Sequence, residues 1–301
     1  MNVLQINGLT KSYGKIRAVN GLTMSLESGQ VMGLLGPNGS GKTTTLGIIL
    51  GILHSDSGSY EWFGGQYGQA EARRHIGAIL ETPNFYPYLD ADDNLDIYRR
   101  IKELPKQNFD QILDRVGLLE RRKSKFHTYS LGMKQRLAVA ATLIGDPDVL
   151  IFDEPTNGLD PNGIADMRNI IQGIANEGKT VLMASHILDE VEKICSHVTI
   201  LQKGHLLASG PVGHILTDNR FVIVDSEDNH KLKRVFSSVA GIVNISDKDN
   251  MLALEVEASI GATRVNQIAS EAGIWLCHLE ERKNTLEDEF LEITHKHTNN
   301  Q

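Results

Sequence analysis

The sequence predicts an α/β domain with a largely parallel sheet, followed by a small C-terminal α+β domain. Over the first two thirds of the chain, short apolar segments alternate with longer polar segments that suit helices, which is typical of strands joined by crossover helices. A glycine-rich segment, GPNGSGKTT at 36–44, separates one such strand from the helix after it. From about residue 220 the order of predicted elements changes, which indicates a second domain.

Chain-level properties narrow the class of protein. The 301 residues suit one large domain and a small one, and 23% charged with 41% hydrophobic residues is ordinary globular composition. The net charge of −8 argues against a general nucleic-acid binder. The N-terminus lacks a signal-peptide layout and the longest apolar runs, such as 46–53, are too short to cross a bilayer, so we expect a soluble chain. Cys195 and Cys277 have no pairing or metal-ligand spacing and are expected to be inert thiols.

Buried strands are predicted where apolar and β-branched residues follow one another. The candidates are 31–36, 76–80, 148–153, 180–185 and 198–202. Between them, 91–104 and 108–119 have a composition compatible with helices. The segment SGP at 209–211 suggests the end of this domain, which gives predicted domains at 1–215 and 216–301.

The C-terminal domain is predicted to have the β-α-β-β-α-β order of a ferredoxin-like unit. Strand-like and helix-like segments alternate in that order at 221–225, 231–239, 243–247, 251–257, 262–273 and 274–281. An amphipathic helix at 285–295 is expected to close the chain.

The segment 36–44 fits the pattern G-x-x-x-x-G-K-[ST]. Glycines let successive backbone N–H groups point into one concavity for phosphate oxygens, and the following helix adds the positive end of its dipole. Lys42 is expected to reach the β- and γ-phosphates, and the Thr43 hydroxyl to hold Mg²⁺. The sequence therefore predicts a nucleoside triphosphate site formed by Gly36, Pro37, Asn38, Gly39, Ser40, Gly41, Lys42, Thr43 and Thr44.

Two adjacent carboxylates end the predicted strand 148–153. Asp153 lies at the strand tip, where open α/β sheets bind ligands, and is expected to hold the Mg²⁺ that bridges the phosphates. Glu154 is one residue further on, so it points the other way and can face the attacking water as a general base. The alternative is a solvated acidic turn. The apolar strand before the pair and the phosphate loop favour the catalytic interpretation.

Two further segments carry polar residues at predicted element ends. His186 follows the strand 180–185 at the sheet edge that also holds the phosphate loop, so it could reach the γ-phosphate. Ser130 is predicted to cap a largely buried helix at 131–144. That helix has cationic residues in its first turns, where the helix dipole is positive, and a bound anion would compensate them.

Residues 1 to about 215 resemble the ATP-binding subunit of ABC transporters, and the motifs occur in the same order along the chain. GPNGSGKT is similar to the Walker A loop, DVLIFDEP at 148–155 to the Walker B strand, and NGLDP at 157–161 to the D-loop through Asp160. The resemblance implies that His186 is the switch histidine and that Tyr13 is the aromatic residue stacked on adenine, although a surface packing role is the alternative for Tyr13. It also implies the P-loop NTPase fold of an ABC-type nucleotide-binding domain, with a RecA-like α/β core, an antiparallel β subdomain and a helical signature subdomain at about 84–145. ATP and Mg²⁺ are the implied cofactors.

YSLGMKQR at 129–136 resembles the family signature, usually written LSGGQQQR. In the family this segment lies against the γ-phosphate bound by a second copy, so the resemblance implies an ATP-sandwich homodimer contacted by Ser130, Leu131, Gly132 and Met133. Leu131 and Met133 depart from the family pattern. Glu81 also departs from it, because it stands where the Q-loop glutamine is usual; a carboxylate there can still bind Mg²⁺ or the water.

These departures, and the ending TLEDEFLEIT at 285–294, resemble the branch that exports drugs, bacitracin and lantibiotics through a separate permease. The resemblance implies a cytoplasmic ATPase held at the membrane by that permease, with no nucleic-acid partner. The aromatic segment NFYPYL at 84–89 is expected either to receive a permease helix or to be a packed loop.

Other function classes fit less well. A non-transport ABC ATPase of the translation or DNA-repair type would need a second cassette or a long coiled coil, and the interval between Thr44 and Tyr129 is short. A regulatory module without turnover would be expected to lack Glu154 or Lys42, and both are present.

Overall fold

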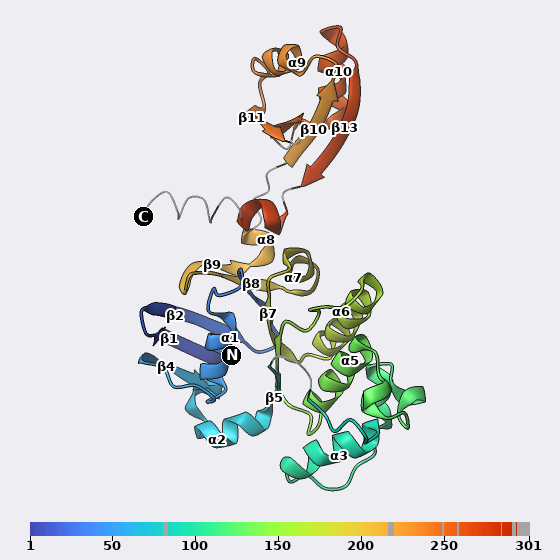
Figure 1. Ribbon diagram of the computed structural model, residues 1–301. Coiled ribbons are helices and arrows are strands. Elements are labelled where there is room, and N and C mark those ends of the chain that lie inside the picture. Colours follow the sequence, from blue (N-terminus) through green and yellow to red (C-terminus); the bar gives the residue numbers. More distant parts are fainter. Residues whose placement is uncertain are drawn as a thin grey trace. The chain divides into compact units, whose positions relative to one another are not determined.

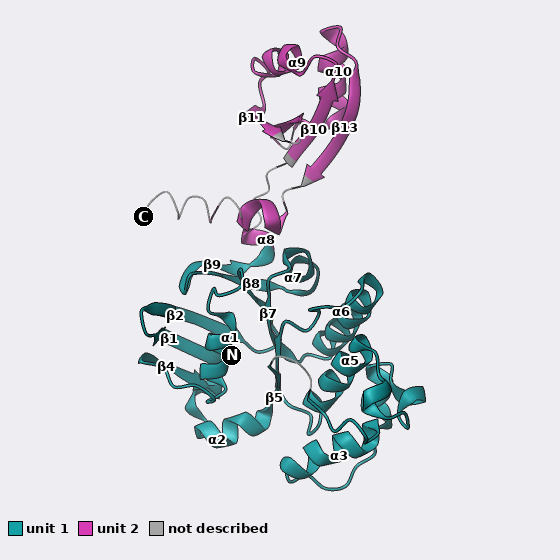
Figure 2. Cartoon of the chain, in the orientation of Figure 1, with its two compact units in different colours: residues 1–212, 294–301 teal, residues 213–293 magenta. Residues whose placement is uncertain are grey.

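The computed structural model divides the chain into two compact units, one built on Met1–Val212 and the other spanning Gly213–Ile293 (Figure 2). Each unit is considered by itself. The structure describes residues 1–80, 84–215, 220–248, 250–257, 259–283, 285–290 and 293.

A six-stranded sheet forms the centre of the first unit (Figure 1). Its strands, in spatial order, are β5 (Ile76–Ile79), β6 (Val149–Asp153), β7 (Thr180–Ser185), β3 (Val31–Leu35), β8 (His197–Gln202) and β9 (His205–Pro211). The first five are parallel, and they are the five strands that the sequence predicted; β9 pairs antiparallel with β8. Every residue of β3 and β6 is buried, which explains their continuous apolar sequences.

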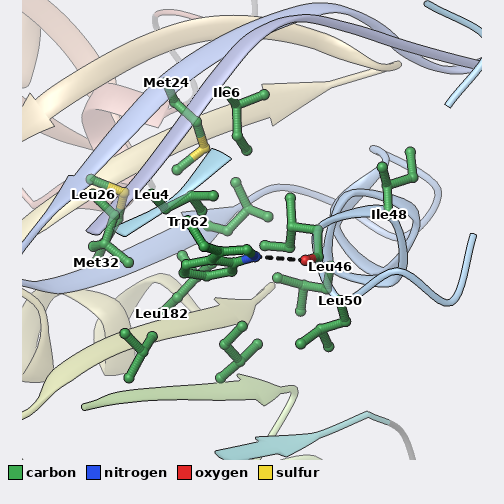
Figure 3. Packing of buried hydrophobic residues seen from close by; sticks show 14 of the residues in the cluster. Leu4, Ile6, Met24, Leu26, Met32, Leu46, Ile48, Leu50, Trp62 and Leu182 are labelled. Carbon is green, nitrogen blue, oxygen red and sulfur yellow. Dashed lines mark hydrogen bonds between the residues drawn. The ribbon is translucent and has the colours of Figure 1, made fainter. Parts of the chain in front are cut away.

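A three-stranded antiparallel sheet covers part of this core. Its strands are β2 (Ile16–Glu27), β1 (Asn2–Tyr13) and β4 (Ser57–Trp62), in that spatial order. Figure 3 shows how apolar residues from this sheet, from α1 (Lys42–Ile49) and from the central sheet pack together. Trp62 is 4% exposed in this cluster, and its Nε1 donates a hydrogen bond of 2.8 Å to the Ile49 carbonyl at the end of α1. The phosphate-loop helix is therefore anchored to the antiparallel sheet.

The remaining α-helices of this unit are α2 (Gln69–Ala72), α3 (Ala91–Ile101), α4 (Asp110–Arg115), α5 (Leu131–Thr142), α6 (Pro161–Asn176) and α7 (Leu188–Ile194), followed by α8 (Val212–Ile215) at the boundary. Short 3₁₀ turns occupy Phe63–Gly65, Arg73–His75, Leu119–Arg121 and Phe126–Thr128. The predicted helix at 108–119 is too long. It ends at Arg115 because Gly117 has a left-handed φ of 63°. In the described part of the chain, no helix has both the length and the apolar character needed to span a bilayer.

The second unit contains the predicted β-α-β-β-α-β order of elements. They are β10 (Arg220–Ser226), α9 (Asn229–Phe236), β11 (Ile242–Lys248), β12 (Met251–Val256), α10 (Ala262–Glu271) and β13 (Leu276–Lys283). The strands form an antiparallel sheet in the order β11-β12-β10-β13. Its own apolar core includes Val222, Leu232, Phe236 and Leu254. Residues 286–290, within the predicted terminal helix, are helical.

The anchoring role of Trp62 gives a test of the core. Trp62→Phe removes the donor to the buried Ile49 carbonyl and leaves a small cavity, so the free energy of unfolding of the first unit should fall by about 2–4 kcal/mol. Urea denaturation followed by far-UV circular dichroism measures this change. Trp275→Phe is the matched control, because Trp275 is 83% exposed. Equal stabilities for the two variants would contradict this account of the core.

Candidate nucleotide-binding site

The carboxyl ends of three parallel strands bring distant segments together. Leu35, the last residue of β3, lies opposite Ser185 at the end of β7, and Asp153 at the end of β6 lies opposite Ala184. Because parallel strands end at the same sheet edge, the loops that leave these strands share one face of the sheet. The predicted phosphate loop, carboxylate pair and histidine are the residues that follow.

The backbone of the phosphate loop is shaped by its glycines. Gly39 and Gly41 have φ values of 79° and 107°. A Cβ on Gly41 would lie 2.2 Å from the Ala18 carbonyl oxygen of β2, so a side chain is excluded there. At Gly39 no heavy atom lies within 4 Å of that position, so the loop is open on that side.

The polar groups of the loop suit a phosphate ligand. The Ser40 Oγ is buried and lacks a hydrogen-bond partner among the described residues. Thr43, in the first turn of α1, is exposed, whereas Thr44 is half-buried. Pro37 and Asn38 are exposed. A buried hydroxyl, an open concave loop and a helix start together form a cradle that fits a polyphosphate.

Lys42 is held inside this cradle. Its side chain is 5% exposed, and its Nζ donates a hydrogen bond of 2.7 Å to the Gly36 carbonyl. The same Nζ lies 3.3 Å from Oε1 of Glu154. The structure therefore places the predicted phosphate-binding lysine in contact with the predicted general base.

Glu154 lies between two polar partners. Its other carboxylate oxygen, Oε2, is 2.7 Å from Nδ1 of His186. Its backbone N–H donates to the Ala184 carbonyl at 3.0 Å, and its φ is 50°, which is uncommon for a residue with a side chain. Such backbone strain persists where surrounding contacts fix the conformation, and it is concentrated at functional sites. Asp153, the neighbouring acid, is 5% exposed.

The segments expected to meet a second copy have defined local roles. The Ser130 Oγ accepts a hydrogen bond of 3.3 Å from the Met133 N–H, so Ser130 caps α5 as predicted. Leu131 is 43% exposed. Asp160 caps α6, since its Oδ1 accepts a hydrogen bond of 2.8 Å from the Gly163 N–H.

Tyr13 and Glu81 are less well defined. Tyr13 ends β1, is 48% exposed and has the Lys11 Nζ 5.7 Å from its ring centroid. Tyr13 pairs with Ile16 at the start of β2, and Ala18, two residues further along β2, lies beside Gly41 of the phosphate loop. Glu81 lies outside the described residues, so its predicted role stays a prediction.

The aromatic segment after Glu81 divides into packed and exposed residues. Phe85 is 7% exposed and its ring lies 5.4 Å and 5.1 Å from those of Tyr98 and Phe126, so the packed-loop alternative holds for Phe85. Tyr86 and Tyr88 are 61% and 78% exposed. Beside Phe85 lies a cavity of about 230 Å³, lined by residues of β5, α3 and α5.

Some contacts had no local sequence signal. Arg168 of α6 and Glu190 of α7 form an ion pair of 2.5 Å, and Glu190 is 3% exposed. Both residues occur in ordinary amphipathic helices, so only the fold pairs them. Burial raises the pKa of the Cys195 thiol to about 12, which keeps it protonated at neutral pH, as expected for an inert cysteine.

A phosphate loop, strand-end carboxylates and a histidine at one edge of a parallel sheet define a P-loop nucleoside triphosphatase. The family model described as ABC transporter matches residues 19–157. The chain is 36% identical over 297 residues to the bacitracin transport ATP-binding protein BcrA of Bacillus licheniformis, with 97% of each chain covered. It is 40% identical over 205 residues to the lantibiotic transport ATP-binding protein SrtF of Streptococcus pyogenes, covering 68% of this chain and 89% of that protein.

A solved structure of an ATP-binding subunit of an ABC transporter is similar, with a TM-score of 0.62 and 29% identity over 71% of this chain and 91% of that one. The chain therefore belongs to the ABC transporter family. It is an ATPase, like the ATP-binding subunits of that family.

Lys42 is the residue whose replacement should most directly weaken nucleotide binding. Lys42→Ala removes a buried charge from the phosphate cradle, so ATP affinity should fall by roughly 10- to 100-fold, equivalent to about 1.5–3 kcal/mol. Isothermal titration calorimetry measures this change. Lys106→Ala, at an exposed position, should bind ATP like the wild type. Undiminished affinity in Lys42→Ala would show that the loop is not the nucleotide site.

Proposed function

We propose that this chain is the ATP-hydrolysing subunit of an ABC exporter that moves a drug, an antibiotic peptide or a lantibiotic through a separate membrane permease. The observation that carries the proposal is the placement of Glu154 between Lys42 and His186, directly beside the phosphate loop. The class of cargo is supported by the relatives named for bacitracin and lantibiotic transport. The direction of transport, export, rests on the resemblance of the sequence to the exporting branch.

The phosphate loop holds ATP through its backbone N–H groups, and Lys42 contacts the β- and γ-phosphates. The residues that would hold Mg²⁺ are Thr43 and Asp153, with Glu81 as a further ligand. Mg²⁺ would neutralise the negative charge that develops on the transferred phosphoryl group. The exposed position of Thr43 in the first turn of α1 and the position of Asp153 at the end of β6 support this assignment.

Glu154 acts as the general base toward the attacking water. In the structure, one of its oxygens meets Lys42 and the other meets His186. A bound triphosphate competes for Lys42, because its charge exceeds that of one carboxylate. Once Lys42 turns to the phosphates, Oε1 of Glu154 can accept the proton of the water while His186 holds Oε2.

ATP is enclosed between two copies of the chain. The backbone of Ser130, Leu131, Gly132 and Met133 at the start of α5 in one copy faces the γ-phosphate bound by the other, and Asp160 lies at the same interface. The exposure of Ser130 at the start of α5 supports this role, because helix N-terminal N–H groups attract anions. Closure of the dimer and its reopening after hydrolysis would drive the permease.

The base assignment is tested with Glu154→Gln. The amide cannot accept the proton, so the rate of ATP hydrolysis should fall by about 100-fold or more while ATP still binds. Without turnover, ATP should hold the chain as a dimer, which size-exclusion chromatography with multi-angle light scattering measures. Rapid turnover by this variant would refute the base assignment, and a monomer in saturating ATP would refute the sandwich.

The permease is proposed to dock on the exposed part of the aromatic segment 84–89 of the first unit. Tyr86 and Tyr88 are exposed and follow Phe85, which lines the cavity between β5, α3 and α5. Exposed aromatic side chains are frequent anchors of interfaces. Docking of this kind would keep the chain cytoplasmic and peripheral at the membrane.

The docking surface is tested by affinity purification from detergent-solubilised membranes with ATP, using tagged Glu154→Gln protein. Recovery of a polytopic membrane protein in near-equal amount is expected. Adding Tyr86→Ala and Tyr88→Ala should reduce that recovery by about tenfold, which corresponds to the loss of interface anchors. Trp275→Ala is the control for an exposed aromatic residue elsewhere.

Unchanged recovery with the tyrosine variants would place the interface elsewhere. Recovery of ribosomes instead of a membrane protein would favour the non-transport ABC ATPase.

A further inference from the structure

The signature segment touches the turn that follows the general base within the same chain. The Cδ2 atom of Leu131 lies 3.2 Å from the position that a Cβ on Gly158 would occupy. Similarly, a Cβ on Gly132 would lie 3.8 Å from Cδ2 of Leu159. The Leu131 side chain therefore lies over Gly158, and Gly132 lies near Leu159, within one chain.

This turn has little freedom of its own. The Asn157 N–H donates to the Glu154 carbonyl at 3.1 Å, and the Leu159 N–H donates to the Thr156 carbonyl at 3.2 Å. Thr156 is 2% exposed, and Asp160 at the far end caps α6. Two backbone hydrogen bonds therefore connect this segment to Glu154 and Thr156.

Gly158 is the residue of the turn with the greatest backbone freedom. Its φ is 76°, in the left-handed region, and glycine also visits many other backbone conformations. The Leu131 side chain lies over this residue and restricts the room into which the turn could move. A glycine at position 131 would leave that side of Gly158 without a covering side chain.

We propose that Leu131 is a positioning residue for ATP hydrolysis, which holds the Gly158–Leu159 turn and through it the backbone of Glu154. The inference rests on the proposed function, because it assigns Leu131 a role in the hydrolysis attributed to Glu154. Leu131 is 43% exposed, so its side chain contributes little to the core. Its contact with Gly158 fixes the position of the Gly158–Leu159 turn and through it that of Glu154. An error of about 1 Å in the position of a catalytic group can cost up to about 100-fold in rate.

The test measures ATP hydrolysis by the full-length chain. Leu131→Ala should lower kcat by about tenfold and leave the KM for ATP within about twofold of wild type. Leu131→Met, which restores side-chain length, should recover most of the rate. Ile52→Ala is the matched control, because Ile52 is a 65% exposed aliphatic residue away from the proposed site. Thermal melts of each variant separate lost positioning from lost folding.

A second measurement separates positioning from dimer contact. Leu131→Ala in the Glu154→Gln background should still form the ATP-bound dimer, because the substitution keeps the backbone that faces the partner's nucleotide and removes only a side chain that lies over Gly158 of its own chain. Loss of that dimer would show that Leu131 acts at the interface and would overturn the inference.

A double-mutant cycle tests the contact itself. Gly158→Ala places a Cβ against Leu131 and strains a left-handed backbone, so it should lower kcat by both effects. Combining it with Leu131→Ala removes only the contact, so the change in kcat should be non-additive. Additive effects, or a wild-type kcat in Leu131→Ala, would overturn the inference alone. A wild-type chain without ATPase activity would overturn the proposed function together with it.

Discussion

The parallel register of β3, β6 and β7 is the constraint on which the site depends. Residues at the ends of these strands lie side by side although they are far apart in the sequence. That register fixes where the phosphate loop begins, where Asp153 ends its strand and where His186 leaves β7. Every residue of these three strands is buried, so side chains packed closely on both faces hold the register.

The same edge of the sheet explains the charge arrangement of the candidate nucleotide-binding site. Lys42 is a buried cation, and burial of an unpaired charge is costly. Its contacts with the Gly36 carbonyl and with Glu154 satisfy it until an anionic ligand takes their place. His186 Nδ1 contacts the second carboxylate oxygen of Glu154. The binding residues and the hydrolytic residues thus form one network, so a ligand that contacts Lys42 also changes the surroundings of Glu154.

Local patterns in the sequence predict the parallel strands, the phosphate loop and the cap at Ser130, since each depends on neighbouring residues. Contacts between distant segments are not visible in this way. The pair Arg168–Glu190 and the packing of Leu131 on Gly158 exist only because the fold brings separate helices and turns together. The aromatic segment shows the same limit. Its composition does not reveal that Phe85 is buried while Tyr86 and Tyr88 remain exposed. The end of α4 was missed because Gly117 adopts a left-handed conformation.

The two units have separate apolar cores, and among the described residues no side chain belongs to both. A substitution in one core therefore disturbs first the side-chain packing of its own unit. Selection can act on the two modules at different rates, so sequence divergence in β10–β13 need not be accompanied by divergence around the phosphate loop.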